Sequence, residues 1–171
     1  GVDVAVPTYV FFGNDATGVA ASDATSTIED QGHLEGYGNG MTLLSLSGAQ
    51  NTVNVAGELV ATGASAIALD ASAPSADRIS VAQTGIVTGD MLVTAGADHV
   101  TIDGTVNGDL TLGAEARLDG TGAIYGMVSG EGVLAPGDTA ATTASAITLS
   151  RYEADGGTLD INVFGDRSIA T

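Results

Sequence analysis

A short unit, Gly-x-aliphatic, recurs five times along the chain and constrains its fold more than any other feature. It occurs as Gly32-His33-Leu34, Gly57-Glu58-Leu59, Gly85-Ile86-Val87, Gly104-Thr105-Val106 and Gly122-Ala123-Ile124. A second glycine follows two residues later in four of the five units, at Gly36, Gly89, Gly108 and Gly126. The first glycines lie 25, 28, 19 and 18 residues apart, close to the roughly 20–30 residues of many solenoid coils. This repeat predicts stacked coils.

A second pattern, Asx-x-aliphatic-polar-aliphatic, recurs in step with the first. It begins at Asn51, Asp77 and Asp98. Alternation of apolar and polar residues is the signal of a half-buried strand, and helical periodicity is nearly absent. The two patterns together predict an all-β, right-handed parallel β-helix (β-solenoid) of about seven coils. Residues 70–77 are expected to form a loop added to one coil, and the repeated glycines are expected at corners with positive φ.

The expected organisation has three parts within one solenoid. Residues 1–26 form an N-terminal coil or cap, which includes Tyr9-Val10-Phe11-Phe12. Residues 27–138 form the β-helix coils, and residues 139–171 form a C-terminal coil and strand in which Leu159, Ile161 and Val163 alternate with polar residues. The chain opens Gly1-Val2-Asp3, and we expect it to be a processed chain or a piece of a longer one.

Charge excludes several classes of partner. The chain has 21 acidic residues and 4 basic ones, all arginine, for a net charge of −17. Nucleic-acid binding depends on Lys and Arg that neutralise phosphates, so no nucleic-acid partner is expected. Cysteine is absent, which excludes disulfides and thiol catalysis. No segment approaches the roughly 20 apolar residues of a membrane helix.

Few residues are candidates for a site, and the expectation is that there are no catalytic, cofactor-binding or metal-binding residues. His33 and His99, the only histidines, are expected at outward or corner positions with a structural role. Asn51, Asp77 and Asp98 share one register and are expected to stack, each capping a turn through its own backbone. The alternative for this stack is a Ca²⁺ site, because Ca²⁺ takes several oxygen ligands.

An enzyme acting on polysaccharides is a further alternative. Glycoside hydrolysis needs two carboxylates roughly 5–9.5 Å apart, and stacked coils can supply them. The candidate residues are Asp98, Asp103, Asp109 and Asp119. Tryptophan, the usual sugar platform, and lysine are both absent. We therefore expect a protein that is not an enzyme.

The C-terminal third carries a recognisable motif. Residues 126–138 read GMVSGEGVLAPGD, followed by Ile147-Thr148-Leu149, by Tyr152 and by GGTLDINV at residues 156–163. This order resembles the passenger-associated repeat of autotransporters (type V secretion). The resemblance implies a β-helical passenger exported through the outer-membrane β-barrel translocator of the same precursor, with these residues near its autochaperone-like C-terminal end.

The expected function follows from the predicted fold and from this resemblance. It is a non-catalytic structural segment, a stalk or adhesin scaffold, at the extracellular surface of a Gram-negative bacterium. Its expected partners, besides the translocator, are a host or neighbouring-cell surface and other copies of the chain. The alternative to the stalk is a self-assembling extracellular filament, in which the ends of the solenoid stack coil to coil.

Overall fold

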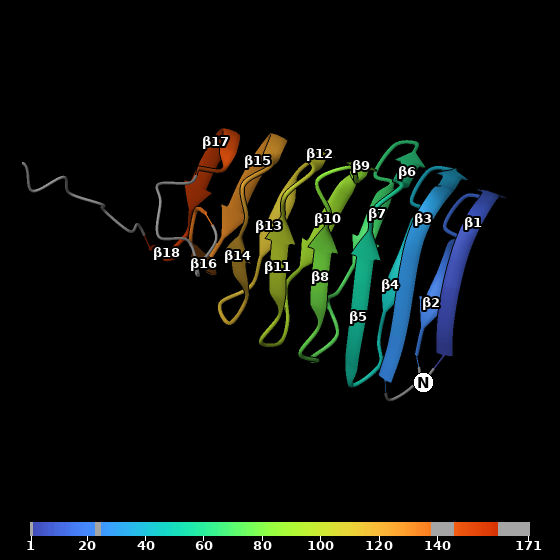
Figure 1. Ribbon diagram of the computed structural model, residues 1–171, viewed down its shortest axis with the longest axis horizontal. Helices are drawn as coiled ribbons and strands as arrows, with labels where there is room; N and C mark the ends of the chain where they lie inside the picture. The colour runs from blue at the N-terminus through green and yellow to red at the C-terminus, as the bar shows by residue number, and fades with distance from the viewer. Residues whose placement is uncertain (1, 23–24, 138–145, 161–171) are drawn as a thin grey trace, which may run out of the picture.

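The computed structural model describes residues 2–22, 25–137 and 146–160. Eighteen strands, all paired in parallel, stack into a β-solenoid of about six turns (Figure 1). The predicted fold class is confirmed, with slightly fewer coils than the seven expected. These residues contain no helix, and thus none that is long and apolar enough to cross a membrane.

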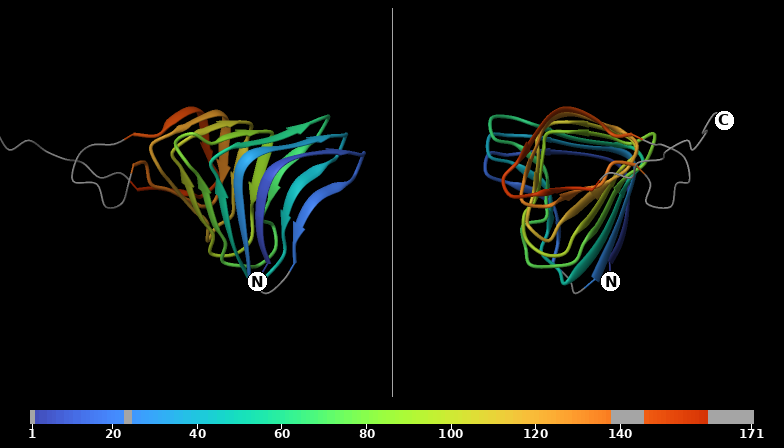
Figure 2. Two further views of the ribbon diagram at one scale, coloured as in Figure 1. Left: turned by 45° about the vertical axis from the view of Figure 1, so that its right-hand side comes forward. Right: turned by 90° about the vertical axis from the view of Figure 1, so that its left-hand side faces the viewer.

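Each coil passes over three faces, which give the solenoid a triangular outline along its axis (Figure 2). Face A consists of the first halves of β1 (Val2–Phe12) and β3 (Thr25–Tyr37), followed by β5 (Gln50–Val55), β8 (Arg78–Val81), β11 (His99–Ile102), β14 (Arg117–Asp119), β16 (Val133–Leu134) and β18 (Thr158–Leu159). Face B consists of the second halves of β1 and β3, followed by β6 (Glu58–Thr62), β9 (Ile86–Thr88), β12 (Thr105–Asn107) and the first parts of β15 (Ala123–Gly130) and β17 (Thr148–Ala154). Face C consists of β2 (Thr17–Ala21), β4 (Thr42–Leu46), β7 (Ile67–Asp70), β10 (Asp90–Val93), β13 (Leu110–Leu112) and the last parts of β15 and β17.

The Gly-x-aliphatic repeat is the stacking register of face B. Its aliphatic residues pair directly from coil to coil and are fully buried: Leu34, Leu59, Val87, Val106 and Ile124. The second pattern is likewise the register of face A, where Val53, Ile79 and Val100 stack. Both registers were predicted correctly because side chains of a strand alternate between inside and outside with period two.

The repeated glycines have a different physical reason from the one expected. Gly104 and Gly122, like Gly57 and Gly85, do not have positive φ. A Cβ on Gly104 would lie 2.3 Å from the backbone oxygen of Gly85, and one on Gly122 would lie 2.1 Å from that of Gly104. Only glycine fits, because the backbone of the neighbouring coil occupies the space of a side chain. Among the second glycines, Gly89 does have positive φ, at 115°.

The coils differ in length along the chain: the spacing falls to 16 positions between β14 and β16 and is 25 again between β15 and β17. Residues that face each other in adjacent coils are 25 positions apart in the early coils and 18 apart between the coils of β11 and β14. The later coils accordingly enclose a smaller cross-section (Figure 2). Of the loop predicted at residues 70–77, residues 71–77 lie between β7 and β8, whereas Asp70 is the last residue of β7. Ser75 forms an isolated bridge with Gly96 in the next coil.

The two ends of the described stack are less covered than its middle. Tyr9 in β1 pairs with Leu34, an inward position, yet it is 51% exposed because none of the described coils lies on its other side. At the other end Leu159 pairs with Leu134 and is half exposed. The strand expected to run from Leu159 to Val163 is described only as β18, and Ile161 and Val163 lie outside the described residues.

Candidate functional site

Face A presents two parallel ranks of outward side chains across four coils. The first rank consists of Thr52, Arg78, His99 and Arg117, which are paired in register from coil to coil. The second rank lies two residues further along each strand and consists of Asn54, Ser80, Thr101 and Asp119. The alternating residues between them point into the core. The parallel stack thus places polar groups from distant parts of the chain side by side.

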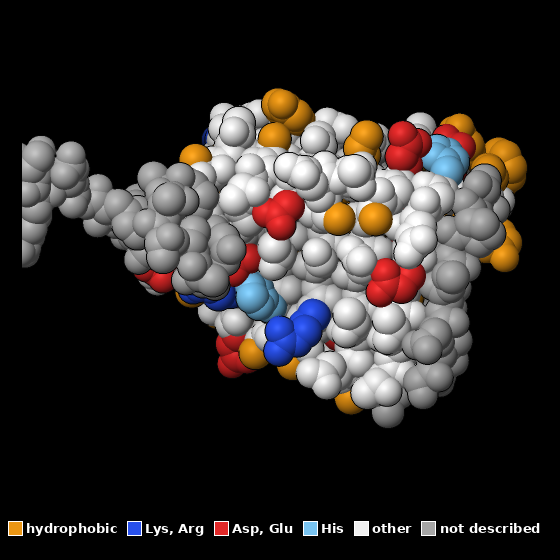
Figure 3. All heavy atoms as spheres, viewed as in Figure 1, with side chains coloured by type: hydrophobic (Ala, Val, Ile, Leu, Met, Phe, Trp, Pro, Cys, Tyr) orange, Lys and Arg blue, Asp and Glu red, His pale blue; other side chains and the backbone are white. Residues whose placement is uncertain are grey.

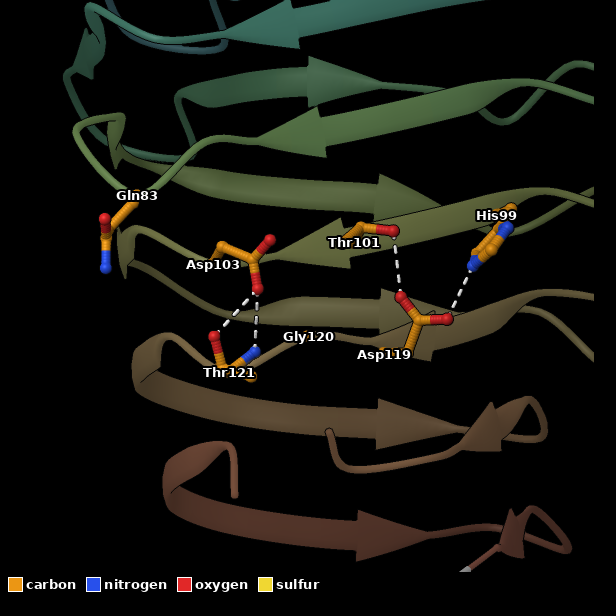
Figure 4. Close-up of a pocket in the computed structure, with 7 residues that line it drawn as sticks. All are labelled: Gln83, His99, Thr101, Asp103, Asp119, Gly120 and Thr121. Atoms are coloured by element: carbon orange, nitrogen blue, oxygen red, sulfur yellow. Dashed lines mark hydrogen bonds and ion pairs between the residues drawn. The ribbon is translucent and has the colours of Figure 1, made fainter. Parts of the chain in front are cut away.

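Asp119 is the centre of a hydrogen-bonded cluster on this face. Its Oδ2 lies 2.6 Å from Nε2 of His99, and its Oδ1 accepts a hydrogen bond of 2.8 Å from the Thr101 hydroxyl (Figure 4). The guanidinium of Arg117 is 3.8 Å from the same carboxylate and 3.6 Å from that of Asp160. Asp119 is buried, so its contacts with His99 and Thr101 offset the loss of hydration that burial imposes.

A hollow of about 600 Å³ opens beside this cluster. The residues that line it are Gln83, His99, Thr101, Asp103, Asp119, Gly120 and Thr121, all with polar side chains except Gly120. Asp103 is held in place because its Oδ1 accepts hydrogen bonds of 3.0 and 2.9 Å from the backbone N–H and the hydroxyl of Thr121 (Figure 4). A smaller hollow of about 220 Å³ also contacts His99 and Thr101 and extends toward Arg78 and Ser80.

The stack of Asn51, Asp77 and Asp98 is real, but it lies inside the solenoid. All three residues are buried. Oδ1 of Asp77 accepts hydrogen bonds of 2.7 and 2.9 Å from the backbone and side-chain nitrogens of Asn51, and Oδ1 of Asp98 accepts one of 2.8 Å from the backbone N–H of Asp77. The expectation that each caps its own backbone was therefore wrong, because each aspartate caps the preceding coil.

Burial perturbs the acids in the interior. Desolvation raises the pKa of Asp98 to about 6, more than the hydrogen bond from Asp77 lowers it, and the charge of Asp77 raises it further. Desolvation also raises the pKa of Asp30, whose Oδ1 accepts a hydrogen bond from the backbone of Gly32. Oδ2 of each of these aspartates has no hydrogen-bond partner among the described residues. Protonation relieves such a site because the neutral acid is easier to bury.

His33 lies in a second polar cluster, on the outside of face B. Its Nδ1 is 2.8 Å from Glu58 and its Nε2 is 3.0 Å from Glu35, which also bonds the Tyr37 hydroxyl. Hydrogen bonds to Glu35 and Glu58 raise the pKa of His33. The ring is partly exposed, so both histidines are outward as predicted. Each, however, contacts a carboxylate of an adjacent coil.

The four carboxylates considered for glycoside hydrolysis are divided by the fold. Asp103 and Asp119 line the same hollow. Asp98 was a wrong candidate because it points into the core. Asp109 lies between faces B and C, where it accepts a hydrogen bond of 2.7 Å from the backbone N–H of Met127.

Sequence reasoning missed Arg78, Ser80 and Thr101 as site residues. The second pattern contained the signal, because it puts Arg78 and His99 at one outward position and Ser80 and Thr101 at the next. Within the part of the chain that the structure describes, no group of three or more His, Asp or Glu residues is arranged to hold a metal ion. The arrangement is instead suited to hydrogen-bonding a polar ligand in the hollows. No family model, curated protein or solved structure matches the chain.

Proposed function

We propose that the chain is a structural, non-catalytic segment of an autotransporter passenger, exported to the surface of a Gram-negative bacterium. Its role there is to form a stiff β-solenoid that holds other parts of the passenger away from the outer membrane. The resemblance of residues 126–163 to the passenger-associated repeat motivates the family. The translocator of the same precursor is the expected partner during export.

The observation that carries the structural role is the continuous ladder from β1 to β18. Strands of each coil pair with the next coil through parallel hydrogen bonds on all three faces. The interior is a continuous stack of aliphatic side chains. Each coil is hydrogen-bonded to its neighbours on all three faces, so the stack resists bending. It does so without cysteine, and the high negative charge favours solubility.

Surface export tests the proposal directly. The chain is expressed between an export signal and an outer-membrane β-barrel translocator, and intact cells are treated with protease. We expect the protease to cut the displayed chain from the surface of intact cells. The released chain should retain a folded core that resists further digestion. The control is a Val106→Asp variant, whose buried charge should prevent folding. Accumulation of the wild-type chain in the periplasm would contradict the proposal.

A filament subunit is the second candidate, and the half-exposed Tyr9 favours it. An inward side chain that is open to solvent at the end of a solenoid can be covered by another coil. The ends of the described stack nevertheless differ in length. On face A, the first half of β1 pairs with β3 over five residues, whereas the described part of β18 has 2 residues. A head-to-tail contact between the described coils would leave part of the face A edge of β1 unpaired, which favours the rod.

Electron microscopy and light scattering over a range of concentrations distinguish the two candidates. Short rods of constant mass are expected for the stalk. Filaments that lengthen with concentration would move the protein to the polymer class.

A further inference from the structure

Residues 71–77 connect β7 to β8 at the corner between faces C and A. The corresponding connection in the following coil, between β10 and β11, is shorter and consists of residues 94–98. Loop 71–77 contains none of the Val, Leu, Ile and aromatic residues that anchor the strands. Its buried side chains are those of Ala71, Ser75 and Asp77. The loop is therefore held on the solenoid mainly by polar and backbone contacts, which makes it a region of low local stability.

Two contacts fasten the end of the loop to the following coil. Ser75 forms its bridge with Gly96, and the two backbones are so close that a Cβ on Gly96 would lie 1.8 Å from the backbone oxygen of Ser75. The backbone N–H of Asp77 donates a hydrogen bond of 2.8 Å to Oδ1 of Asp98. The loop thus ends directly on a carboxylate of the next coil.

That carboxylate lies beside a second one, out of reach of bulk solvent. Asp77 and Asp98 are each 1% exposed. Oδ2 of Asp77 accepts a hydrogen bond of 2.9 Å from the Ser75 hydroxyl, whereas Oδ2 of Asp98 has no partner among the described residues. Two neighbouring buried carboxylates are both ionised only at a high cost in desolvation and repulsion. A proton on Asp98 therefore stabilises the docked loop.

The cations near this pair lie outside the solenoid and do not neutralise it. In the register of Asp77 and Asp98 the next coil has Ala116, which is not titratable. Figure 3 shows Arg and His side chains next to each other on the outer surface over β8 and β11. The charged residues at the positions adjacent to this register are Arg78, His99, Glu115 and Arg117. Among the described residues, no ion pair joins any of them to Asp77 or Asp98.

We propose that loop 71–77 is a pH-controlled gate, docked on the following coil while Asp98 holds a proton and released when Asp98 ionises. Release moves Asp77 away from Asp98 and lets water reach both carboxylates. Burial, with a smaller contribution from the charge of Asp77, raises the pKa of Asp98 to about 6 in the docked state. Docking is therefore fully stabilised below pH 3.8 and weakens as the pH rises through about 6. The strands on all three faces stay paired, so the rod persists while its corner opens.

Hydrogen exchange of the Asp77 amide, followed by NMR on the whole chain, tests the gate. Between about pH 5 and about pH 7 its protection, corrected for the intrinsic exchange rate, should fall about tenfold. Low concentrations of urea should leave this exchange unchanged, because a local opening exposes little surface. The amide of Thr105, which donates to the backbone oxygen of Gly85 on face B, is the internal reference. Its exchange should accelerate with urea, because it requires unpairing of the coils.

Two variants identify the titrating group. Asp98→Asn keeps an oxygen for the N–H of Asp77 and cannot ionise, so the protection of Asp77 should be the same at both pH values. Asp109→Asn is the matched control. Asp109 also accepts a hydrogen bond from a backbone N–H of the following coil, that of Met127 at 2.7 Å, but it is exposed. This variant should retain the tenfold fall at Asp77.

Three outcomes would overturn the proposal. They are equal protection of Asp77 at both pH values in the wild-type chain, exchange of Asp77 that depends on urea as steeply as that of Thr105, and a pH-dependent fall that persists in Asp98→Asn. The first two are measured on the wild-type chain and decide the question even if Asp98→Asn does not fold. Export plays no part in this experiment, so the gate and the proposed function fail separately.

Discussion

Asp98 shows how burial inside a solenoid changes the pKa of an acidic residue. It is stacked directly beside Asp77, and both side chains are almost completely buried. Such a site is shielded from bulk solvent, so each carboxylate is poorly solvated and like charges repel more strongly. The pKa of Asp98 rises to about 6 as a result. The folded protein therefore holds a proton there at a pH where the unfolded chain has lost it.

This difference predicts the direction of a pH effect on stability. The pKa of Asp98 is higher in the folded chain than in the unfolded chain, where it is 3.8. Its contribution to stability is complete below pH 3.8 and is lost as the pH rises through about 6. At pH 7 the ionised Asp98 costs up to about 3 kcal/mol relative to a group with an unshifted pKa.

Asp98→Asn should raise the free energy of unfolding at pH 7 by about 1–3 kcal/mol and flatten its dependence on pH between 4 and 6. The amide keeps an oxygen for the N–H of Asp77, and Asn51 shows that an amide fits this ladder. Urea unfolding at a series of pH values measures the effect. Asp155→Asn, at an exposed site, should retain the wild-type slope. An equal slope in both variants would rule out Asp98 as the titrating group.

At the scale of the strand, alternation decides which residue tolerates a charge. Val106 and Thr105 are neighbours in β12. Val106 points inward and is fully buried between Val87 and Ile124, whereas Thr105 points outward between Ile86 and Ala123. A shift of one residue in register would exchange the two environments.

Val106→Asp should cost several kcal/mol in unfolding free energy, because it buries a carboxylate without a partner. Thr105→Asp should cost less than about 1 kcal/mol, because the new charge stays in water. Thermal and urea unfolding of the two variants provide the comparison. Similar losses for both would mean that the register of face B is wrong.

The corners of the coils depend on backbone contact. A Cβ on Gly104 would lie 2.3 Å from the backbone oxygens of both Ala82 and Gly85. Backbone cannot move aside as a flexible side chain can, so Gly104→Ala must push its own coil away from the preceding one at the corner between β8 and β9. We expect a loss of about 2–3 kcal/mol. Thr105→Ala, one residue away and outside the core, is the control and should change stability by less than about 0.5 kcal/mol. A neutral Gly104→Ala would contradict the close approach.

The whole molecule combines a one-dimensional stack with a large net charge. Each coil is stabilised by its neighbours, and the charge of −17 repels itself along the length of the rod. Self-repulsion of this kind destabilises the compact state and is screened by salt. The screening length falls from about 30 Å at 0.01 M to about 8 Å at 0.15 M, which is comparable to a spacing of one or two coils.

Raising sodium chloride from about 0.01 M to about 0.15 M should therefore raise the melting temperature. We expect a shift of about 2–4 °C, which corresponds to about 1 kcal/mol for a chain of this size. Differential scanning calorimetry measures it, and potassium chloride should act identically. A much larger rise with calcium chloride at equal ionic strength would support a Ca²⁺ site instead of general screening. A fall in melting temperature would contradict the role given to repulsion.

Much of the fold is determined by the sequence alone. The Gly-x-aliphatic and Asx-x-aliphatic-polar-aliphatic patterns predict the strands, their inward residues and the stacking register of faces A and B. They succeed because alternation within a strand and repetition between coils are both local patterns, and because a buried inward position admits few residue types.

Tertiary structure alone decided which residues form the site and which groups each aspartate contacts. The coil that contains β14 lacks the second pattern, since Ala116 stands in the Asx position, so nothing local places Asp119 beside His99. Coil length also varies from 28 residues to 16, and the side chains that meet depend on every intervening loop. Asp98 and Asp103 are five residues apart, and alternation along β11 puts one in the core and the other at the larger hollow on face A. Their hydrogen-bond partners, Asp77 and Thr121, come from adjacent coils, which only the tertiary packing brings into register.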